Sequence, residues 1–271
     1  MKGCGRLNIF TSASMTKLNS PFPWVGGKRL LRDHIISLFP KHTTYIEAFA
    51  GGAWVYWGKE PSAVEVINDI NGNLVNLYRQ IQSNRDQFYE RLWYLMASRD
   101  EYYRLTGIIK DLPTELSDLD RAVYYFYVIR NAFGGRFGSG FGFSRRQPPK
   151  SAITQDTLVA LSERLSKTYI ENLSFERLIK NYDTVDALFY CDPPFTGSDG
   201  TRDYEHVMTE EKHILLRDQL ASIKGKFLVS YNDDKMVRNL YKDFKIEKTK
   251  EIQYSLSQNK RYQHEIVIRN Y

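Results

Sequence analysis

The sequence predicts an α/β fold with a mostly parallel sheet, and it predicts that a helical insertion interrupts this sheet. Short apolar stretches typical of buried strands alternate with segments of helical periodicity. The block from about Asn84 to Lys167 breaks the alternation, because it carries helical patterns and no strand pattern. We therefore expect a sheet domain formed by residues 17–83 and 168–271, an inserted subdomain over residues 84–167, and an N-terminal extension over residues 1–16.

The first elements of the sheet are expected before the insertion. Thr43–Gly52 is an apolar stretch that ends in a glycine turn, and Ala63–Asn71 has the pattern of a second strand. Asn73–Asn84 follows with apolar residues at helical spacing, so it is predicted to be a helix. These elements give the order strand, strand, helix ahead of the insertion.

The remaining elements are expected after the insertion. Their predicted order is strand, strand, helix, strand and a closing hairpin. The corresponding segments are Lys167–Phe175, Asp186–Phe195, Thr209–Ile223, Lys226–Asp233, and the pair Phe244–Leu256 with Arg261–Tyr271. The whole pattern is typical of an α/β fold with a mostly parallel sheet.

Composition narrows the class of protein. The net charge of +6 fits a partner of negative charge such as nucleic acid, but an ordinary basic enzyme fits it equally well. Two cysteines, Cys4 and Cys191, cannot build a disulfide framework or a multi-cysteine zinc site, which favours a reducing cytosol. No stretch approaches the roughly 18 apolar residues of a membrane span, and we expect no signal peptide. Met15 is an alternative start.

A glycine turn and an acid follow the first two strands. Ligands bind at the carboxyl ends of strands in open α/β sheets, and Gly51 and Gly52 allow close approach of a backbone. Asp69 comes 69 − 52 = 17 residues after the turn, a spacing at which an acid accepts hydrogen bonds from ribose hydroxyls. The alternatives are a plain strand-to-helix turn and a helix N-cap at Asp69.

The segment Asp192-Pro193-Pro194-Phe195 ends the fourth predicted strand. Two prolines stiffen the backbone and remove two donors, so the Asp192 carboxylate and the Pro193 carbonyl form a pair of acceptors. Such a pair can hold an amino group with two hydrogens, and Phe195 offers a face on which a base can stack. The alternative is a strand that simply stops at proline, with Phe195 in the core.

The chain proper opens with Pro21–Leu31, which contains Gly26-Gly27-Lys28 just before a predicted helix. This is half of a Walker A loop, but the full pattern is not met because Arg29 follows the lysine. The glycine turn can still place Lys28 against a cofactor carboxylate or a phosphate.

Taken together, four segments resemble the Dam-type adenine-specific DNA methyltransferases: Pro21–Lys28, Glu47–Gly52, Asn68–Asn71 and Asp192–Phe195. Their order is that of the α-group, and the resemblance continues through Phe227–Asp233 to the C-terminal strand. It implies a Rossmann-like S-adenosylmethionine (SAM) dependent methyltransferase sheet with an inserted DNA-recognition subdomain. It also implies methyl transfer to the exocyclic amino group of adenine in double-stranded DNA, after the base is flipped out of the duplex.

The resemblance also implies the cofactor site. SAM would be bound by Trp24, Lys28, Glu47, Phe49, Gly51, Gly52, Asp69, Phe175 and Asp192. The family often has an acid before Phe175, but Ser174 stands there in this chain, so only the phenylalanine carries over. The histidines show no ligand spacing, and no metal is expected.

Catalysis is expected at Asp192, Pro193, Pro194 and Phe195. The usual family motif ends in tyrosine, and phenylalanine keeps its stacking face while losing the hydroxyl. Phe195 would stack on the flipped base, with Tyr204 as a second contact, while the two acceptors align the amino nitrogen for direct transfer. Cys191 lies in an apolar strand, where an inert thiol is expected.

The glycine-rich segment Asn131–Lys150 is the expected DNA reader, since basic residues among aromatic ones can contact phosphates and bases. The candidate contacts are Arg130, Asn131, Arg136, Phe141, Arg145, Arg146 and Lys150. A solvated surface loop is the alternative. GATC-specific members carry a stretch of the type NG-x-x-R-Y-N here, and this chain has Gly134–Gly138 instead, so GATC and another short or relaxed site both stay open.

Other functions also stay open at this stage. One is methylation of a cytosine amino group or of RNA, and another is a SAM- and DNA-binding protein without turnover. We expect a monomer that acts in the cytoplasm of a bacterium or a phage-infected host, with a cognate restriction endonuclease as a further candidate partner.

Overall fold

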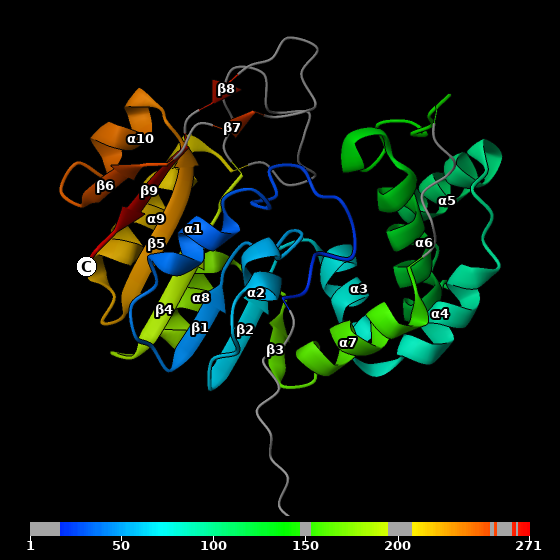
Figure 1. Ribbon diagram of the computed structural model, residues 1–271, viewed down its shortest axis with the longest axis horizontal. Helices are drawn as coiled ribbons and strands as arrows, with labels where there is room; N and C mark the ends of the chain where they lie inside the picture. The colour runs from blue at the N-terminus through cyan, green and yellow to red at the C-terminus, as the bar shows by residue number, and fades with distance from the viewer. Residues whose placement is uncertain (1–16, 147–152, 195–207, 250–251, 254–261, 264) are drawn as a thin grey trace, which may run out of the picture.

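A seven-stranded sheet forms one side of the molecule, on the left in Figure 1. The computed structural model describes residues 17–146, 153–194, 208–249, 252–253, 262–263 and 265–271. The strands of the sheet are β1 (Thr44–Glu47), β2 (Val64–Asn68), β3 (Thr168–Glu171), β4 (Ala187–Cys191), β5 (Lys226–Asn232), β6 (Lys245–Lys248) and β9 (Glu265–Arg269). Their order is β3-β2-β1-β4-β5-β9-β6. Neighbours are parallel from β3 to β5, and β9 is antiparallel to both β5 and β6, which confirms the predicted α/β class.

The two faces of the sheet bury different side chains, because successive residues of a strand point to opposite faces. Tyr45 and Tyr190 belong to one apolar cluster, whereas Ile46 and Phe189 belong to the other. Helices α1 (Arg32–Ser37) and α2 (Trp54–Gly58) cover the first face and lie in front of the sheet in Figure 1. The second face packs against α8 (Phe175–Tyr182), α9 (Glu210–Ser222) and α10 (Lys235–Leu240).

A group of helices lies beside the sheet, as Figure 1 shows on the right. It contains α3 (Gly72–Ser83), α4 (Arg85–Trp93), α5 (Arg99–Asp111), α6 (Asp118–Asn131), the short 3₁₀ helix η1 (Phe133–Gly135) and α7 (Gln155–Leu165). Helix α6 packs against α3, α4 and α5, and α7 packs against α3. These helices share one apolar cluster with the first face of the sheet. The proposed boundaries at residues 84 and 167 therefore stay a prediction.

The segment before α1 connects the helices to the sheet. Phe22 is buried, and its ring lies 6.2 Å from that of Phe126 on α6 and 5.9 Å from that of Tyr78 on α3. Arg130, at the end of α6, donates a hydrogen bond to the Pro21 carbonyl (2.9 Å). The predicted extension over residues 1–16 lies outside the described residues.

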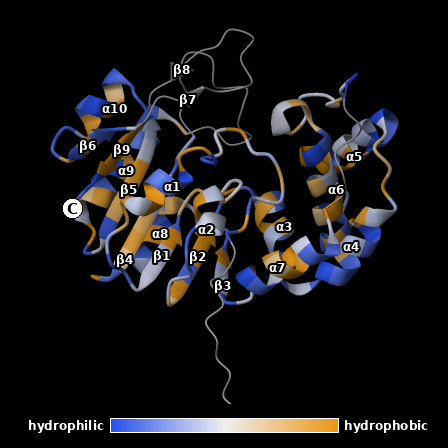
Figure 2. Ribbon diagram, in the orientation of Figure 1, coloured by the Kyte–Doolittle hydropathy of each residue, from blue (hydrophilic) through white to orange (hydrophobic). Residues whose placement is uncertain are grey.

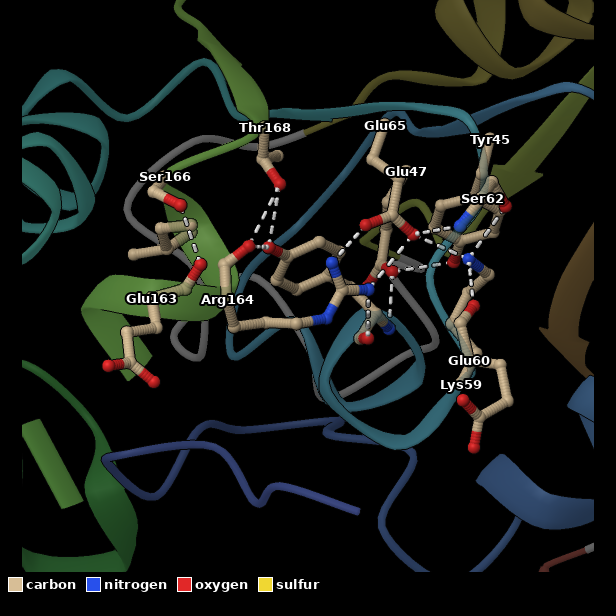
Figure 3. Close-up of polar contacts among 12 residues, drawn as sticks. Tyr45, Glu47, Lys59, Glu60, Ser62, Glu65, Glu163, Arg164, Ser166 and Thr168 are labelled. Atoms are coloured by element: carbon tan, nitrogen blue, oxygen red, sulfur yellow. Dashed lines mark hydrogen bonds and ion pairs between the residues drawn. The ribbon is translucent and has the colours of Figure 1, made fainter. Parts of the chain in front are cut away.

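A buried ionic cluster ties α7 to β2 (Figure 3). The Glu65 carboxylate on β2 accepts from Lys59 Nζ (2.5 Å) and from two guanidinium nitrogens of Arg164 on α7. Burial would raise the pKa of Glu65, but the Arg164 hydrogen bonds and the Lys59 charge hold it below its ordinary value. Removing one partner of such a cluster leaves a buried charge without compensation, which is strongly destabilising. The cluster therefore holds α7, the last inserted helix, against the sheet.

The remaining strands, β7 (Ile252–Gln253) and β8 (Tyr262–Gln263), pair antiparallel as a separate ribbon. The expected closing hairpin is confirmed by this pair and by the pairing of β6 with β9. The central strands are mostly hydrophobic in Figure 2, as expected for a sheet covered on both faces. Among the helices that the structure describes, none combines the length and apolar character needed to cross a membrane.

Candidate active site

A cavity of about 480 Å³ opens at the carboxyl ends of β1, β2 and β4, where all three strands run parallel. Its volume lies within the range typical of small-molecule sites. All four segments that carried the family resemblance contribute to its wall. The helical part contributes as well, through Tyr125 on α6 and Gly135-Arg136-Phe137 after it. The site is therefore shared between the sheet and the inserted helices.

The glycine turn after β1 has an unusual backbone. Gly51 and Ala53 have positive φ angles of 47° and 50°. This conformation is strained for the alanine because its Cβ crowds the backbone. A Cβ on Gly51 would lie 2.5 Å from Trp24 Nε1, so the indole ring packs directly on the turn. The turn is held from the other side by Tyr78, whose hydroxyl donates to the Gly51 carbonyl (2.6 Å).

Asp69 lies on the cavity wall just after β2. Its Oδ2 accepts from the Gly51 amide and its Oδ1 from the Asn71 amide, both at 2.9 Å. The alternative that Asp69 caps the next helix is wrong, because the side chain of Asn71 caps α3. An ionised carboxylate oxygen has more than one lone pair, so it can accept more than one hydrogen bond.

Glu47 ends β1 and is buried at the base of the cavity. Its Oε2 accepts from the Tyr45 hydroxyl (2.6 Å) and from the Tyr56 amide (2.9 Å). Burial outweighs these hydrogen bonds and raises the pKa of Glu47 to about 8. At neutral pH this carboxyl therefore carries a proton in most molecules.

Two aromatic rings line another part of the wall. Phe49 and Phe175 lie 5.8 Å apart between ring centroids, and both contact the cavity. Ser174, where the family often has an acid, is the N-cap of α8 and accepts from the Arg177 amide. An acid does line the cavity one position after the phenylalanine, at Glu176, which the sequence did not predict.

Asp192 follows β4 and reaches the same cavity, as does Pro194, while Pro193 is buried between them. The Asp192 Oδ1 atom accepts from Ser230 Oγ (2.9 Å) and forms an ion pair with Lys28 Nζ (2.8 Å). Lys28 was expected to meet a cofactor carboxylate or a phosphate, and in the structure its ammonium group meets the Asp192 carboxylate. Phe195 and Tyr204 lie outside the described residues.

Two residues at this position were missed by sequence reasoning. Ser230 interrupts the apolar strand β5, and Glu265 opens the apolar strand β9 within 3.6 Å of Lys28 Nζ. Both side chains are 1% exposed or less. A polar residue within an otherwise apolar buried strand is the only indication that the sequence offered.

Cys191 is buried in β4, and burial raises the pKa of its thiol well above the ordinary value. This agrees with the expected inert thiol. Within the described ranges, no group of three or more histidine, cysteine, aspartate or glutamate side chains is arranged to hold a metal ion.

The predicted DNA-contact residues divide into three groups. Arg130 and Asn131 are only partly exposed, and both donate to backbone carbonyls, of Pro21 and Tyr127 respectively. Arg136 lines the cavity, and Phe141 packs against the ring of Tyr102. Arg145 and Arg146 are exposed, and Lys150 lies outside the described residues.

The loop that carries these residues folds back on itself. Ala132 and Phe141 form an antiparallel bridge, and Phe133 and Gly142 donate to the carbonyls of Gly140 and Asn131. Gly135, with φ of 70°, is packed so closely on Pro23 that a Cβ would lie 2.8 Å from it. The loop is thereby fixed against the segment that carries Lys28.

A comparison with known protein families matches residues 24–254 to the family described as D12 class N6 adenine-specific DNA methyltransferase. The chain belongs to this family. The match confirms the Dam-type resemblance, and it favours adenine over the cytosine-amino and RNA alternatives.

Individual related proteins agree with this assignment. The methyltransferase is 31% identical over 246 residues to the Type II methyltransferase M1.LlaDCHI of Lactococcus lactis subsp. cremoris, a match that covers 83% of this chain and 85% of that protein. It is 27% identical over 258 residues to a DNA adenine methylase of Haemophilus influenzae, with 87% of each chain covered. The retron Ec67 DNA adenine methylase of Escherichia coli is 25% identical over 235 residues, with 82% and 80% covered.

Proposed function

We propose that this enzyme transfers a methyl group from SAM to the exocyclic amino group of adenine in double-stranded DNA, after the base has left the duplex. The observation that carries the proposal is the position of Asp192. Its carboxylate lies on the wall of the cavity, at the end of β4, and is followed by two prolines. The cavity therefore contains a fixed hydrogen-bond acceptor at a point where a small cofactor and one base can meet.

The cavity fits SAM in its chemistry. SAM carries a ribose with two hydroxyls, an adenine ring, and an amino-acid end with an ammonium and a carboxylate group. Asp69 would accept from the ribose hydroxyls, and Phe49 and Phe175 would flank the adenine ring. Lys28 and Glu47 would lie at the amino-acid end, and Trp24 would support the glycine turn against which the cofactor binds.

The residues of this chain hold and align the amino group. SAM supplies a methyl group already activated on a sulfonium. The Asp192 carboxylate and the Pro193 carbonyl accept the two amino hydrogens, which directs the nitrogen lone pair away from the base plane. Alignment of this kind lowers the barrier without a covalent enzyme intermediate. The bond from the nitrogen to the methyl carbon forms as the bond from that carbon to the sulfonium sulfur breaks, and the nitrogen then loses one of its hydrogens as a proton to the Asp192 carboxylate.

The base has to reach a cavity that a duplex cannot enter, so it is extruded from the stack. We propose that the loop after α6 contacts the DNA, with Arg136 at the cavity and the exposed Arg145 and Arg146 on the phosphate backbone. The target is GATC or another short or relaxed site. The name of the relative M1.LlaDCHI makes a Type II restriction endonuclease a candidate partner.

The test is a methyl-transfer assay with tritium-labelled SAM and plasmid DNA, followed by nucleoside mass spectrometry. We expect label in N6-methyladenine with the wild type. Asp192→Ala should bind SAM and DNA but incorporate no label. A folded wild type without incorporation would favour a non-catalytic DNA-binding protein, and label in methylcytosine alone would refute the choice of base.

A further inference from the structure

A chain of buried hydroxyls ends at Asp192. Ser230 is fully buried on β5 and donates to Asp192 Oδ1, and its Oγ also lies 3.0 Å from the hydroxyl of Tyr190 on β4. A serine hydroxyl has one hydrogen, and here that hydrogen goes to Asp192. Tyr190 must therefore donate to Ser230. Burial raises the pKa of Tyr190 well above its ordinary value, so this donor keeps its proton.

The parallel register of the sheet explains why these residues meet. Cys191 on β4 lies opposite Val229 on β5, so the next residues along the two strands, Asp192 and Ser230, are lateral neighbours. The serine is thus placed by backbone pairing rather than by a loop, which gives its hydroxyl a defined position next to the carboxylate.

Among the described residues, three oxygen atoms lie close to the ammonium group of Lys28. It lies 2.8 Å from Asp192 Oδ1, 3.6 Å from Glu265 Oε2 and 3.0 Å from the Gly26 carbonyl oxygen. The Glu265 side chain is 1% exposed, and that of Lys28 is 10% exposed. Charge attraction in such a dry environment is screened little by water. Glu265 therefore helps to determine the position of the Lys28 ammonium group, the second donor to Asp192.

Both donors that the described part of the chain gives to the Asp192 carboxylate reach the same oxygen, Oδ1. The terminal torsion of an aspartate is soft, so a carboxylate without fixed donors rotates over a wide range. With Oδ1 held by Ser230 and Lys28, Oδ2 is the oxygen presented to an incoming amino group.

We propose that Ser230 and Glu265 are positioning residues for methyl transfer. Ser230 orients the Asp192 carboxylate directly, and Glu265 does so through Lys28, so that Oδ2 accepts a hydrogen of the adenine amino group. Both residues lie outside the four segments that first indicated the family, in the stretches through which the resemblance continues, and the resemblance assigned no role to either. This inference rests on the proposed function, because it assigns a role toward the acceptor that function requires.

The test measures the rate of methyl transfer in a single turnover, started from a complex of enzyme and DNA with saturating SAM. Ser230→Ala should lower this rate about 10- to 100-fold, the effect of losing a hydrogen bond to a charged group. The dissociation constants for SAM and DNA should not change. Ser230→Cys keeps the volume and a weaker donor, so its rate should lie between those of serine and alanine.

A matched control and a second variant separate positioning from stability. Ser162→Ala removes another buried serine hydroxyl, on α7 and away from the cavity, and should transfer at the wild-type rate. Glu265→Gln keeps the shape and removes the charge, and it should slow transfer less than Ser230→Ala. In an Asp192→Asn background, Ser230→Ala should cause no further loss, because its effect passes through Asp192.

The outcomes distinguish this inference from the proposed function. A wild-type rate in Ser230→Ala would overturn the positioning role while leaving adenine methylation intact. So would a Ser230→Ala substitution that lowers the rate by the same factor in the wild-type and Asp192→Asn backgrounds. A wild type that methylates no adenine would overturn both, and that result is visible before any variant is made.

Discussion

Substitution of Glu47 by glutamine tests the electrostatics of the cavity. The pKa of Glu47 is about 8 in the folded protein, against an ordinary value of 4.5 in an unfolded chain. Below pH 4.5 the group is protonated in both states. Between pH 4.5 and 8 the unfolded chain releases this proton and the folded protein keeps it. The stability linked to Glu47 is therefore present at low pH and is lost as the pH rises to about 8.

The size of the effect follows from the same values. Each unit of pKa difference corresponds to about 1.4 kcal/mol. Between pH 5 and pH 8, the wild type should therefore lose about 3.5 kcal/mol of unfolding free energy relative to Glu47→Gln. Glutamine cannot titrate, and its amide can accept from Tyr45 and Tyr56 as the protonated carboxyl does.

The assay is urea unfolding of both proteins at pH 5, 6, 7 and 8, followed by circular dichroism. We expect the unfolding free energy of the wild type to fall steadily, relative to that of the Glu47→Gln variant, as the pH rises. A difference that stays constant over this range would refute the reasoning, because it would mean that Glu47 is already ionised in the folded protein.

Three further predictions concern the cavity wall and the buried ionic cluster. Gly51→Ala adds a Cβ at a positive φ angle and against an indole ring, so calorimetry should show at least about a tenfold loss of SAM affinity. Gly107→Ala, a helical glycine with open space around it, is the control and should bind normally. Asp69→Ala should weaken SAM binding while transfer at saturating SAM persists, and an unchanged affinity would remove the ribose assignment. Arg164→Met leaves Glu65 with one cationic partner, so urea unfolding should show a loss of about 3–5 kcal/mol. A loss below about 1 kcal/mol, as for a surface ion pair, would contradict the importance of this cluster.

Much of the sheet could be predicted from the sequence, because apolar strands and helical periods are local patterns. The position of β9 between β5 and β6 could not, since it depends on pairing between segments far apart in the chain. The cavity was predicted in outline, because its position follows from the order of the strands. The carboxyl ends of neighbouring parallel strands meet, so the glycine turn, Asp69 and Asp192 were expected together.

The sequence could not predict which groups the charged side chains contact. Lys28 and Asp192 are far apart in the chain, and only the folded sheet brings them within 2.8 Å. Residue type alone cannot separate Arg130, which bonds to the Pro21 carbonyl, from the exposed Arg145. Ser230 and Glu265 went unnoticed because their role depends on what lies beside them.

The most direct test of the account is single-molecule sequencing of DNA from cells that express the enzyme, since it identifies the modified base and its sequence context together. We predict N6-methyladenine at one short motif with the wild type and none with Asp192→Ala. Modified cytosine alone, or modified adenine that persists in the Asp192→Ala cells and is absent without the gene, would contradict the assignment of Asp192 as the acceptor for the adenine amino group.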